Sequence, residues 1–225
     1  MSNSDSDSHT RKTRSLKKYE ADIGHALDSA DNPDMQVFSP FGPMIAKFEL
    51  PGELVESLNH FVDQMKLPEH SCEFRILEQA ARAGAPNLIS VTADAIKRYL
   101  DFVEDGSNNE ATGIDFELFW GVYQRSGTPS PVHFHSGDIS GVLYLRTPAD
   151  NIDEERKNYI SGRQAGFINF LIGGKQRYSK SLASFKPVVG DLYIFPGWLL
   201  HGAEPFKGDG ERLSIAFNAN IADQG

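Results

Sequence analysis

The sequence predicts an all-β core with flanking helices, an α+β arrangement in which antiparallel strands form a sandwich or a barrel. The C-terminal half contains short runs of β-branched and aromatic residues, separated by Gly, Pro and Asp clusters. Helical spacers are missing between most of these runs, which disfavours a parallel α/β sheet. The N-terminal half carries two apolar stripes at helical spacing, which need a sheet to cover.

The elements follow from these patterns in chain order. Folded structure is expected to begin near Val37, as short extended runs that reach Leu50. A first helix carries its apolar stripe from Leu54 to Met65, and Pro68 ends it. A second helix starts at Thr92 as N-cap and runs to Val103. The predicted strands are Phe116–Tyr123, Val132–His135, Ser140–Arg146, Phe167–Ile172, Asp191–Phe195 and Arg212–Ala219.

Two segments are expected to lie outside this core. Residues 1–20 combine serines, aspartates and a basic run at 11–18 with almost no apolar content, so we interpret them as a disordered tail. Residues 150–166 form a long charged interruption between predicted strands. We interpret this interruption as a short helix or a lid at the mouth of the β structure.

Composition and charge limit the compartment and the partners. The 22 Lys plus Arg and 31 Asp plus Glu give a net charge of −9, which makes nucleic acid and anionic membranes unfavourable partners. No apolar stretch approaches the ~18 residues of a membrane span, and the N-terminus lacks the apolar run of a signal peptide. The single cysteine, Cys72, cannot form an internal disulfide. We therefore expect a cytoplasmic protein.

Motifs of several common enzyme classes are missing. No G-x-G-x-x-G follows a predicted strand, and no glycine at Walker spacing precedes Gly174-Lys175. A G-x-S-x-G nucleophile motif is also missing, and Cys72 lies in a polar stretch without a helix N-terminus to activate it. These absences argue against nucleotide-binding folds and nucleophilic catalysis.

Three histidines in the β-rich half form a candidate metal site. His133 and His135 are two residues apart on one predicted strand, so their side chains share a face with Cα atoms about 7 Å apart. His201 can complete the site from another strand, and imidazole suits Fe, Zn, Cu or Ni. The other histidines and nearby aromatic residues are interpreted as structural, solvated or core residues: His9, His25, His60, His70, Trp120, Tyr123 and Tyr144.

The last predicted strand has an apolar face and a polar face. Leu213, Ile215 and Phe217 alternate with Arg212 and Ser214 along it. In a cavity, the guanidinium of Arg212 and the hydroxyl of Ser214 would bind a carboxylate. The alternative is an edge strand whose polar face is simply in contact with water.

Two stretches resemble the Fe(II)- and 2-oxoglutarate-dependent oxygenase superfamily, in particular a bacterial and phage branch. They are PVHFHSGDISGVLYL at Pro131–Leu145 and GDLYIFPGWLLHGAEPFKGDGERLSIAFN at Gly190–Asn218. The resemblance implies a double-stranded β-helix barrel, which is a jelly-roll or cupin-like fold, within a single oxygenase domain over 21–225. Its helical support would span about 51–104 and its barrel core about 114–221.

The resemblance also implies cofactors and the residues that bind them. In the superfamily a histidine, a carboxylate two residues later and a distal histidine hold iron, and Arg-x-Ser holds the far carboxylate of 2-oxoglutarate. Carried over, His201 is the distal ligand, and Arg212 and Ser214 bind the co-substrate. The implied reaction uses O2 to convert 2-oxoglutarate into succinate and CO2 while a C–H bond of a small molecule or peptide is oxidised.

The sequence departs from the superfamily pattern at the acidic ligand, because His135 stands two residues after His133. In the alternative that we favour, both are ligands, and the set is His133, His135 and His201. Alternatively, His135 is the proximal histidine and Gly137 occupies the acid's place. A third alternative has Asp138 as the third ligand, which requires a bend at Gly137 because position i+3 faces away.

Two other functions stay open at this point. A cupin-type metalloprotein, either a three-histidine dioxygenase or an isomerase, is loosely matched by Gly127, the H-x-H pair and Gly190 to His201. The cupin glutamate after H-x-H is missing, however, and cupins need no Arg-x-Ser pair. A barrel that binds an anion without turnover is the non-enzymatic alternative. Replacement of Arg212 should abolish 2-oxoglutarate binding in an oxygenase and matter little in a cupin.

Overall fold

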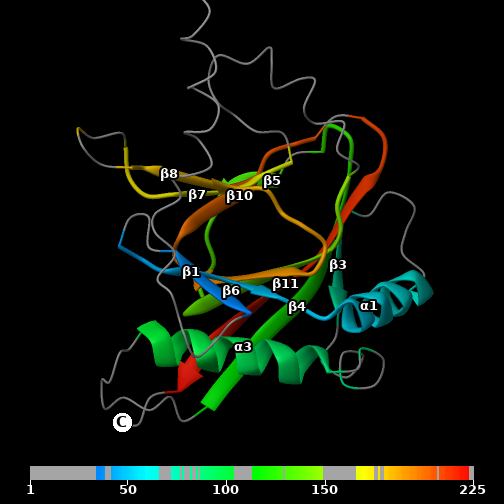
Figure 1. Cartoon of the computed structure of the whole chain (residues 1–225), viewed down its shortest axis with the longest axis horizontal. Helices are drawn as coiled ribbons and strands as arrows, with labels where there is room; N and C mark the ends of the chain where they lie inside the picture. The colour runs from blue at the N-terminus through cyan, green and yellow to red at the C-terminus, as the bar shows by residue number, and fades with distance from the viewer. Residues whose placement is uncertain are drawn as a thin grey trace, which may run out of the picture.

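The computed structural model describes residues 34–38, 42–65, 72–76, 78, 82, 85, 87–103, 113–128, 130–148, 166–174, 177, 180–206 and 208–222. The predicted tail at 1–20 lies outside these residues, and so does all but the last residue of the predicted lid at 150–166. Two antiparallel sheets face each other, and two helices cover the outer side of the larger sheet (Figure 1). The predicted α+β class with an all-β core is confirmed.

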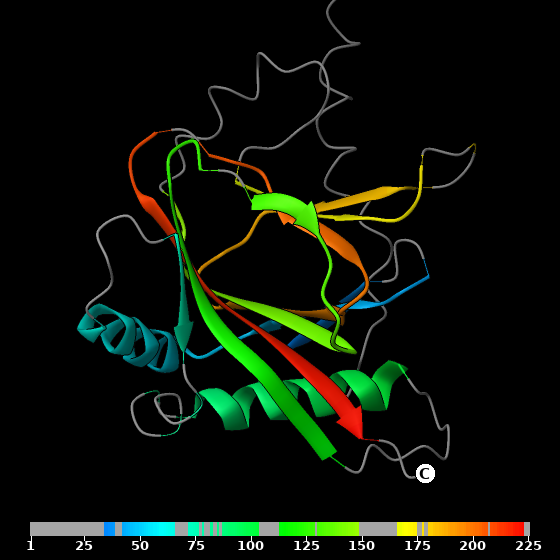
Figure 2. The same ribbon diagram turned by 180° about the vertical axis from the view of Figure 1, so that it is seen from behind.

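The larger sheet has seven strands in the order β1-β2-β9-β6-β11-β4-β3. Their bounds are β1 Met35–Phe38, β2 Ile45–Glu49, β3 Glu73–Ile76, β4 Gly113–Arg125, β6 Ile139–Arg146, β9 Asp191–Pro196 and β11 Glu211–Ala222. The long strands β4 and β11 pair along almost their whole length and cross the molecule diagonally (Figure 2). This pair is the longest strand pairing in the sheet.

The smaller sheet has four strands in the order β5-β10-β7-β8. Their bounds are β5 Ser130–His133, β7 Ile168–Leu171, β8 Leu182–Phe185 and β10 Leu200–Ala203. Within the described residues each sheet pairs only with itself, so the predicted barrel is an open sandwich of two sheets rather than a closed barrel. The reason is that β3 and β5, at the edges beside the opening, pair with β4 and β10 but not with each other.

The two helices pack against the outer face of the larger sheet. The first, α1 (Gly52–Gln64), buries Val55, Leu58, Phe61 and Val62, which is the predicted stripe. The second, α3 (Leu88–Val103), begins four residues before the predicted N-cap at Thr92. Thr92 instead donates its hydroxyl to the Leu88 carbonyl at 2.7 Å, as threonine does inside helices. No helix within the described residues is long and apolar enough to cross a membrane.

All six predicted strands are present, but β3, β8 and β10 were not predicted. Each has only four residues, which is a weak sequence signal for a strand even where polarity alternates, as in Glu73–Ile76. Long-range pairing forms them instead: β10 lies between β5 and β7, and β3 pairs with β4. The strand β2 falls within the extended runs expected between Val37 and Leu50, and β1 begins two residues before Val37.

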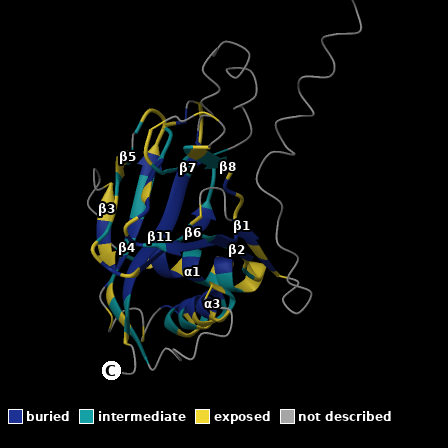
Figure 3. Ribbon diagram, turned by 90° about the vertical axis from the view of Figure 1, so that its left-hand side faces the viewer, coloured by how far each residue is buried: buried dark blue, intermediate teal, exposed yellow. Residues whose placement is uncertain are grey.

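Buried side chains form two hydrophobic cores, and the central strands hold most of them (Figure 3). The first core lies between the helices and the larger sheet, and the second lies between the two sheets. In the first core Phe217 of β11 is paired directly with Gly141 of β6. A Cβ atom on Gly141 would lie 2.3 Å from the Phe217 ring, so this position requires glycine.

Candidate functional site

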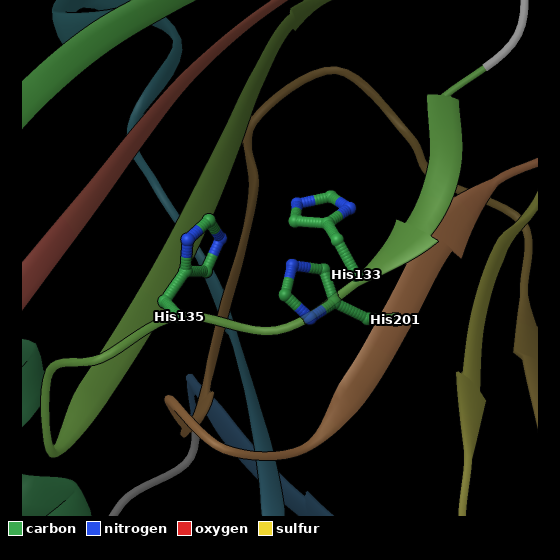
Figure 4. A group of neighbouring side chains, drawn as sticks. All are labelled: His133, His135 and His201. Atoms are coloured by element: carbon green, nitrogen blue, oxygen red, sulfur yellow. The ribbon is translucent and has the colours of Figure 1, made fainter.

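Three histidine side chains converge at the open end of the smaller sheet (Figure 4). His133 ends β5, and His201 lies opposite it on β10. His135 follows in the connection between β5 and β6. One ligand atom from each of the three rings lies within 4.8 Å of the other two. The structure therefore brings together the three residues of the favoured metal set.

His135 reaches this group by a different route from the one predicted. The predicted strand Val132–His135 ends at His133, so the shared-face argument does not place His135. Instead, the His135 backbone N–H donates to the Gly197 carbonyl at 2.9 Å, and the Gly197 N–H donates to the Asp138 carbonyl at 2.8 Å. A Cβ atom on Gly197 would lie 1.9 Å from the Gly137 oxygen, so the contact requires glycine. The Pro-Gly turn after β9 thus holds the loop that carries His135.

Two of the three imidazoles have their tautomer set by the backbone. Nδ1 of His133 lies 2.7 Å from the Pro131 carbonyl oxygen, and Nδ1 of His201 lies 2.8 Å from the Leu199 carbonyl oxygen. Because a carbonyl oxygen only accepts hydrogen bonds, each Nδ1 carries the proton and each Nε2 keeps its lone pair. This arrangement is typical of histidine ligands in metalloproteins.

The protonation of the buried histidines also suits a metal. Burial lowers the pKa of His201 to about 4, against the opposing hydrogen bond to Leu199. Burial and the neighbouring His133 lower the pKa of His135 to about 4, although Glu117 opposes the shift. Both rings are therefore neutral at physiological pH, and a metal ion does not have to displace a proton from either.

Asp138 and Gly137, named in the alternative ligand sets, are placed elsewhere. The Asp138 carboxylate is exposed and accepts a hydrogen bond from the Ile221 backbone N–H at 2.9 Å. Gly137 is buried against β11, where an added Cβ would lie 3.1 Å from the Ala219 oxygen. The group of potential metal ligands within the described residues contains the three histidines and no carboxylate.

Arg212 and Ser214 line the same pocket as the three histidines. Their strand, β11, lies between β6 and β4 in the sheet, so the edge-strand alternative is wrong. Arg212 is only 1% exposed, and burial lowers its pKa. Its Nε donates to Gln124 Oε1 at 2.8 Å, and its Nη1 donates to the Gly166 carbonyl at 3.0 Å.

The other terminal nitrogen of Arg212 has no partner. Nη2 is the one buried side-chain nitrogen or oxygen within the described residues that lacks a hydrogen bond. No ion pair between Arg212 and a carboxylate is found within them either. A buried guanidinium with a spare donor is costly unless an anion binds it. The pocket therefore suits a ligand that carries a carboxylate.

Tyr144 and Trp120 were interpreted as core residues; Tyr144 does belong to the second core, and both residues also line the pocket. Tyr144 is buried on the inner face of β6, and burial raises its pKa to about 12, so the phenol stays protonated beside Arg212. Trp120 is half-buried on β4, and its ring packs edge-to-face against His135 with centroids 5.3 Å apart. The sequence feature that could have placed them in the pocket is strand periodicity. Tyr144 shares a face of β6 with the polar Ser140, and Trp120 shares a face of β4 with the polar Gln124.

These residues fit iron and a dicarboxylate in one pocket. Three imidazoles provide a nitrogen donor set that suits Fe(II), and Nη2 of Arg212, which has no partner among the described residues, provides a donor for a carboxylate. A ligand that chelates the metal with one end and reaches Arg212 with the other would use both features.

Comparison with known families and structures agrees with this chemistry. Residues 118–218, from β4 to β11, match the family described as "Putative 2OG-Fe(II) oxygenase". This segment contains the three histidines, Arg212 and Ser214. The sequence matches none of the curated proteins with which it was compared.

Several solved structures share the fold. HygX from Streptomyces hygroscopicus, with nickel and 2-oxoglutarate bound, is 14% identical with a TM-score of 0.51 over 78% of this chain and 82% of HygX. The viral collagen prolyl hydroxylase of Paramecium Bursaria Chlorella virus-1 is 14% identical with a TM-score of 0.52, over 80% and 92% of the two chains. A Pseudomonas putida prolyl-4-hydroxylase is 16% identical with a TM-score of 0.50, over 80% and 93%.

The matched family and the shared fold agree with the resemblance found in the sequence. The expected double-stranded β-helix fold and the expected cofactors, iron and 2-oxoglutarate, agree with these matches. Residues 118–218 of this chain therefore match a 2-oxoglutarate and Fe(II) oxygenase family, and the chain shares its fold with solved oxygenases that bind 2-oxoglutarate.

Proposed function

We propose that the pocket binds Fe(II) through His133, His135 and His201 and binds 2-oxoglutarate through Arg212 and Ser214, next to a site for a small organic substrate. The observation that carries this proposal is the unpartnered Nη2 of Arg212 in the pocket that the histidines also line. A buried cation and a group of three histidines in one pocket match the two ends of 2-oxoglutarate, a far carboxylate and a chelating 2-oxo acid.

The residues have separate roles in this proposal. Bound Fe(II) and 2-oxoglutarate supply the oxidation: O2 and the co-substrate give succinate, CO2 and one oxygen atom for the substrate C–H bond. The Nη2 of Arg212 donates to the far carboxylate, and Ser214, two residues along the same strand face, donates a second hydrogen bond. The protonated phenol of Tyr144 adds a neutral donor beside Arg212.

The substrate that we propose is a small molecule or a short peptide. The wall beside the histidines is formed by Trp120 and Val122 of β4 and Glu73 of β3. One solved structure of HygX contains hygromycin B, a small molecule, and the viral relative is a collagen prolyl hydroxylase. The net charge of −9 makes nucleic acid an unfavourable substrate. The cytoplasmic location stays a prediction that rests on the lone, free Cys72.

A cupin-type metalloprotein is the second candidate considered in the sequence. It would use the three histidines but would need no buried arginine in the pocket. The position of Arg212, with a donor left over for an anion, favours the oxygenase. Binding of an anion without turnover is the outcome that remains to be separated by experiment.

The test is an anaerobic titration of the Fe(II)-loaded protein with 2-oxoglutarate, followed through the visible metal-to-ligand charge-transfer band of the chelate. We expect a saturable band in the wild type and in Arg125→Ala, which removes an exposed arginine that does not line the pocket. We expect Arg212→Ala to weaken saturation by at least about 100-fold, since it removes a charge-assisted contact to the carboxylate.

Arg212→Lys keeps the charge if Arg212→Ala does not fold, and it should bind 2-oxoglutarate more weakly than the wild type because it lacks the two-pronged geometry. Full iron loading without any band in the wild type would contradict the proposal and favour a cupin. A band without succinate formation in the presence of O2 would indicate an anion-binding protein without turnover.

A further inference from the structure

His135 is held differently from the other two histidines. His133 and His201 each donate Nδ1–H to a carbonyl two residues earlier, which fixes the direction of the ring. His135 lies beyond the end of β5, and its backbone N–H donates to the Gly197 carbonyl. Among the described residues no hydrogen bond reaches its imidazole. Another contact must therefore set the direction of this ring.

Trp120 provides that contact. Its ring meets the His135 ring edge-to-face, with centroids 5.3 Å apart and an interplanar angle of 63°. This is a favourable geometry for aromatic pairs. The other rings near His135 are His133 at 4.9 Å and His201 at 5.1 Å, which are the partner ligands themselves. Trp120 is thus the neighbouring ring that contacts His135 without belonging to the metal group.

The backbone of Trp120 is rigidly placed. It lies in the middle of β4, where it is paired with Ala216 of β11 on one side and with Arg75 of β3 on the other. The indole is half-buried and faces the pocket. Because the Trp120 backbone is paired on both sides, its indole starts from a fixed position. Such a ring can restrict the rotamers of a histidine that lies in a loop.

We propose that Trp120 is a positioning residue whose indole orients His135 toward the metal. This inference rests on the proposed metal site. In most metal sites a hydrogen bond from the second ring nitrogen orients the histidine ligand, and loss of that bond weakens metal binding about 10- to 100-fold. Here an aromatic contact takes that place, because β5 ends before His135 and no hydrogen bond reaches its ring from the described residues.

The first experiment measures Co(II) affinity and the visible ligand-field spectrum of the full chain without 2-oxoglutarate. We expect Trp120→Leu to bind Co(II) about tenfold more weakly and to change the spectrum, since the imidazole then samples several rotamers. Trp120→Phe keeps an aromatic edge and should stay within about threefold of the wild type. Trp198→Leu is the matched control, because Trp198 is exposed and makes no ring contact with the histidines.

The second experiment is a double-mutant cycle with His135→Ala. If Trp120 acts through His135, adding Trp120→Leu to His135→Ala causes no further loss of Co(II) affinity. Losses that multiply would show that Trp120 acts on the pocket as a whole and would overturn the inference. If Trp120→Leu does not fold, Trp120→Met takes its place in the cycle.

Two outcomes separate this inference from the proposed function. Unchanged Co(II) affinity in His201→Ala would overturn the metal site itself. Strong dependence on His201 together with wild-type affinity and spectrum in Trp120→Leu would overturn the positioning role alone.

Discussion

The two faces of β11 are equally buried but differ in chemistry. Leu213, Ile215, Phe217 and Ala219 face the helices and form part of the first core. Arg212, Ser214, Ala216 and Asn218 face the smaller sheet and are also buried, at 1% to 8% exposed. Some polar groups on this inner face form hydrogen bonds with the neighbouring strand: the Ser140 hydroxyl of β6 donates to the Asn218 side chain at 2.8 Å.

This difference shows how one strand serves both folding and function. The helix-facing side chains contribute by burying apolar surface, and the close pairing of Phe217 with Gly141 leaves little space there. The pocket-facing side chains leave one donor, Nη2 of Arg212, without a partner among the described residues. We therefore expect substitutions on the helix side to change stability and substitutions on the pocket side to change ligand binding.

The largest effect is expected on the pocket side, at the metal. His201→Ala removes a buried ligand atom from the centre of the group, so Fe(II) affinity should fall by more than about 100-fold. Fe(II) binding is measured anaerobically by competition with a coloured chelator, and circular dichroism checks the fold. His60→Ala on α1 is the matched control, because His60 is exposed and does not line the pocket. Equal losses of Fe(II) affinity in His201→Ala and His60→Ala would contradict the assignment of metal binding to the pocket side.

On the helix side the effect is expected in stability. Phe217→Ala deletes a fully buried ring that packs on Phe116 and Phe119, so the free energy of unfolding should fall by about 3–5 kcal/mol. Urea unfolding measures this loss, and Phe134→Ala, at a ring that is 64% exposed, should cost far less. The folded fraction should keep its 2-oxoglutarate affinity. If 2-oxoglutarate affinity falls together with the free energy of unfolding, the two faces of β11 are not independent. If Phe217→Ala does not fold, Phe217→Leu is used for the same comparison.

A smaller effect is expected from Ser214→Ala on the pocket side. Loss of one hydrogen bond to a carboxylate, about 1.5 kcal/mol, should weaken 2-oxoglutarate binding roughly tenfold in the charge-transfer titration. The free energy of unfolding should change by less than about 1 kcal/mol, because the hydroxyl faces a pocket. Ser90→Ala, on the exposed side of α3, should leave the affinity unchanged. An unchanged affinity in Ser214→Ala would remove this residue from the co-substrate site.

The smallest effect concerns pH and a polar network at the start of β11. Partial burial by itself would raise the pKa of Glu211, but hydrogen bonds from Tyr123 and Arg146 outweigh it and hold the pKa below its usual value of 4.5. A lowered carboxyl pKa stabilises the folded state above 4.5, and this contribution is lost as the pH falls below that value.

Glu211→Gln should therefore lower the free energy of unfolding by less than about 1 kcal/mol at pH 7, because the carboxylate is partly exposed. The difference between variant and wild type should shrink toward pH 3 in urea unfolding. A difference that grows as the pH falls would contradict the assigned direction of the shift. Co-substrate affinity at pH 7 should not change, since Glu211 is not among the residues that line the pocket.

Local patterns in the sequence were sufficient for much of the fold and part of the site. Alternation along residues 212–219 predicted two chemically distinct faces, and the structure separates them as expected. Helical spacing predicted the buried face of α1. The start of α3 was misplaced at Thr92, because a threonine hydroxyl can bond to a carbonyl four residues earlier inside a helix as well as cap one.

The sequence by itself determined the choice of candidate site residues, because residue type and strand periodicity are local properties: His133, His201, Arg212 and Ser214 could be selected from them. Only the tertiary structure decided how these residues meet. His135 reaches the group through the turn at Gly197, about 60 residues away in the chain. The central position of β11 in the sheet makes Arg212 a buried cation with an unpartnered donor. These features depend on hydrogen bonds and burial between distant segments, which periodicity cannot encode.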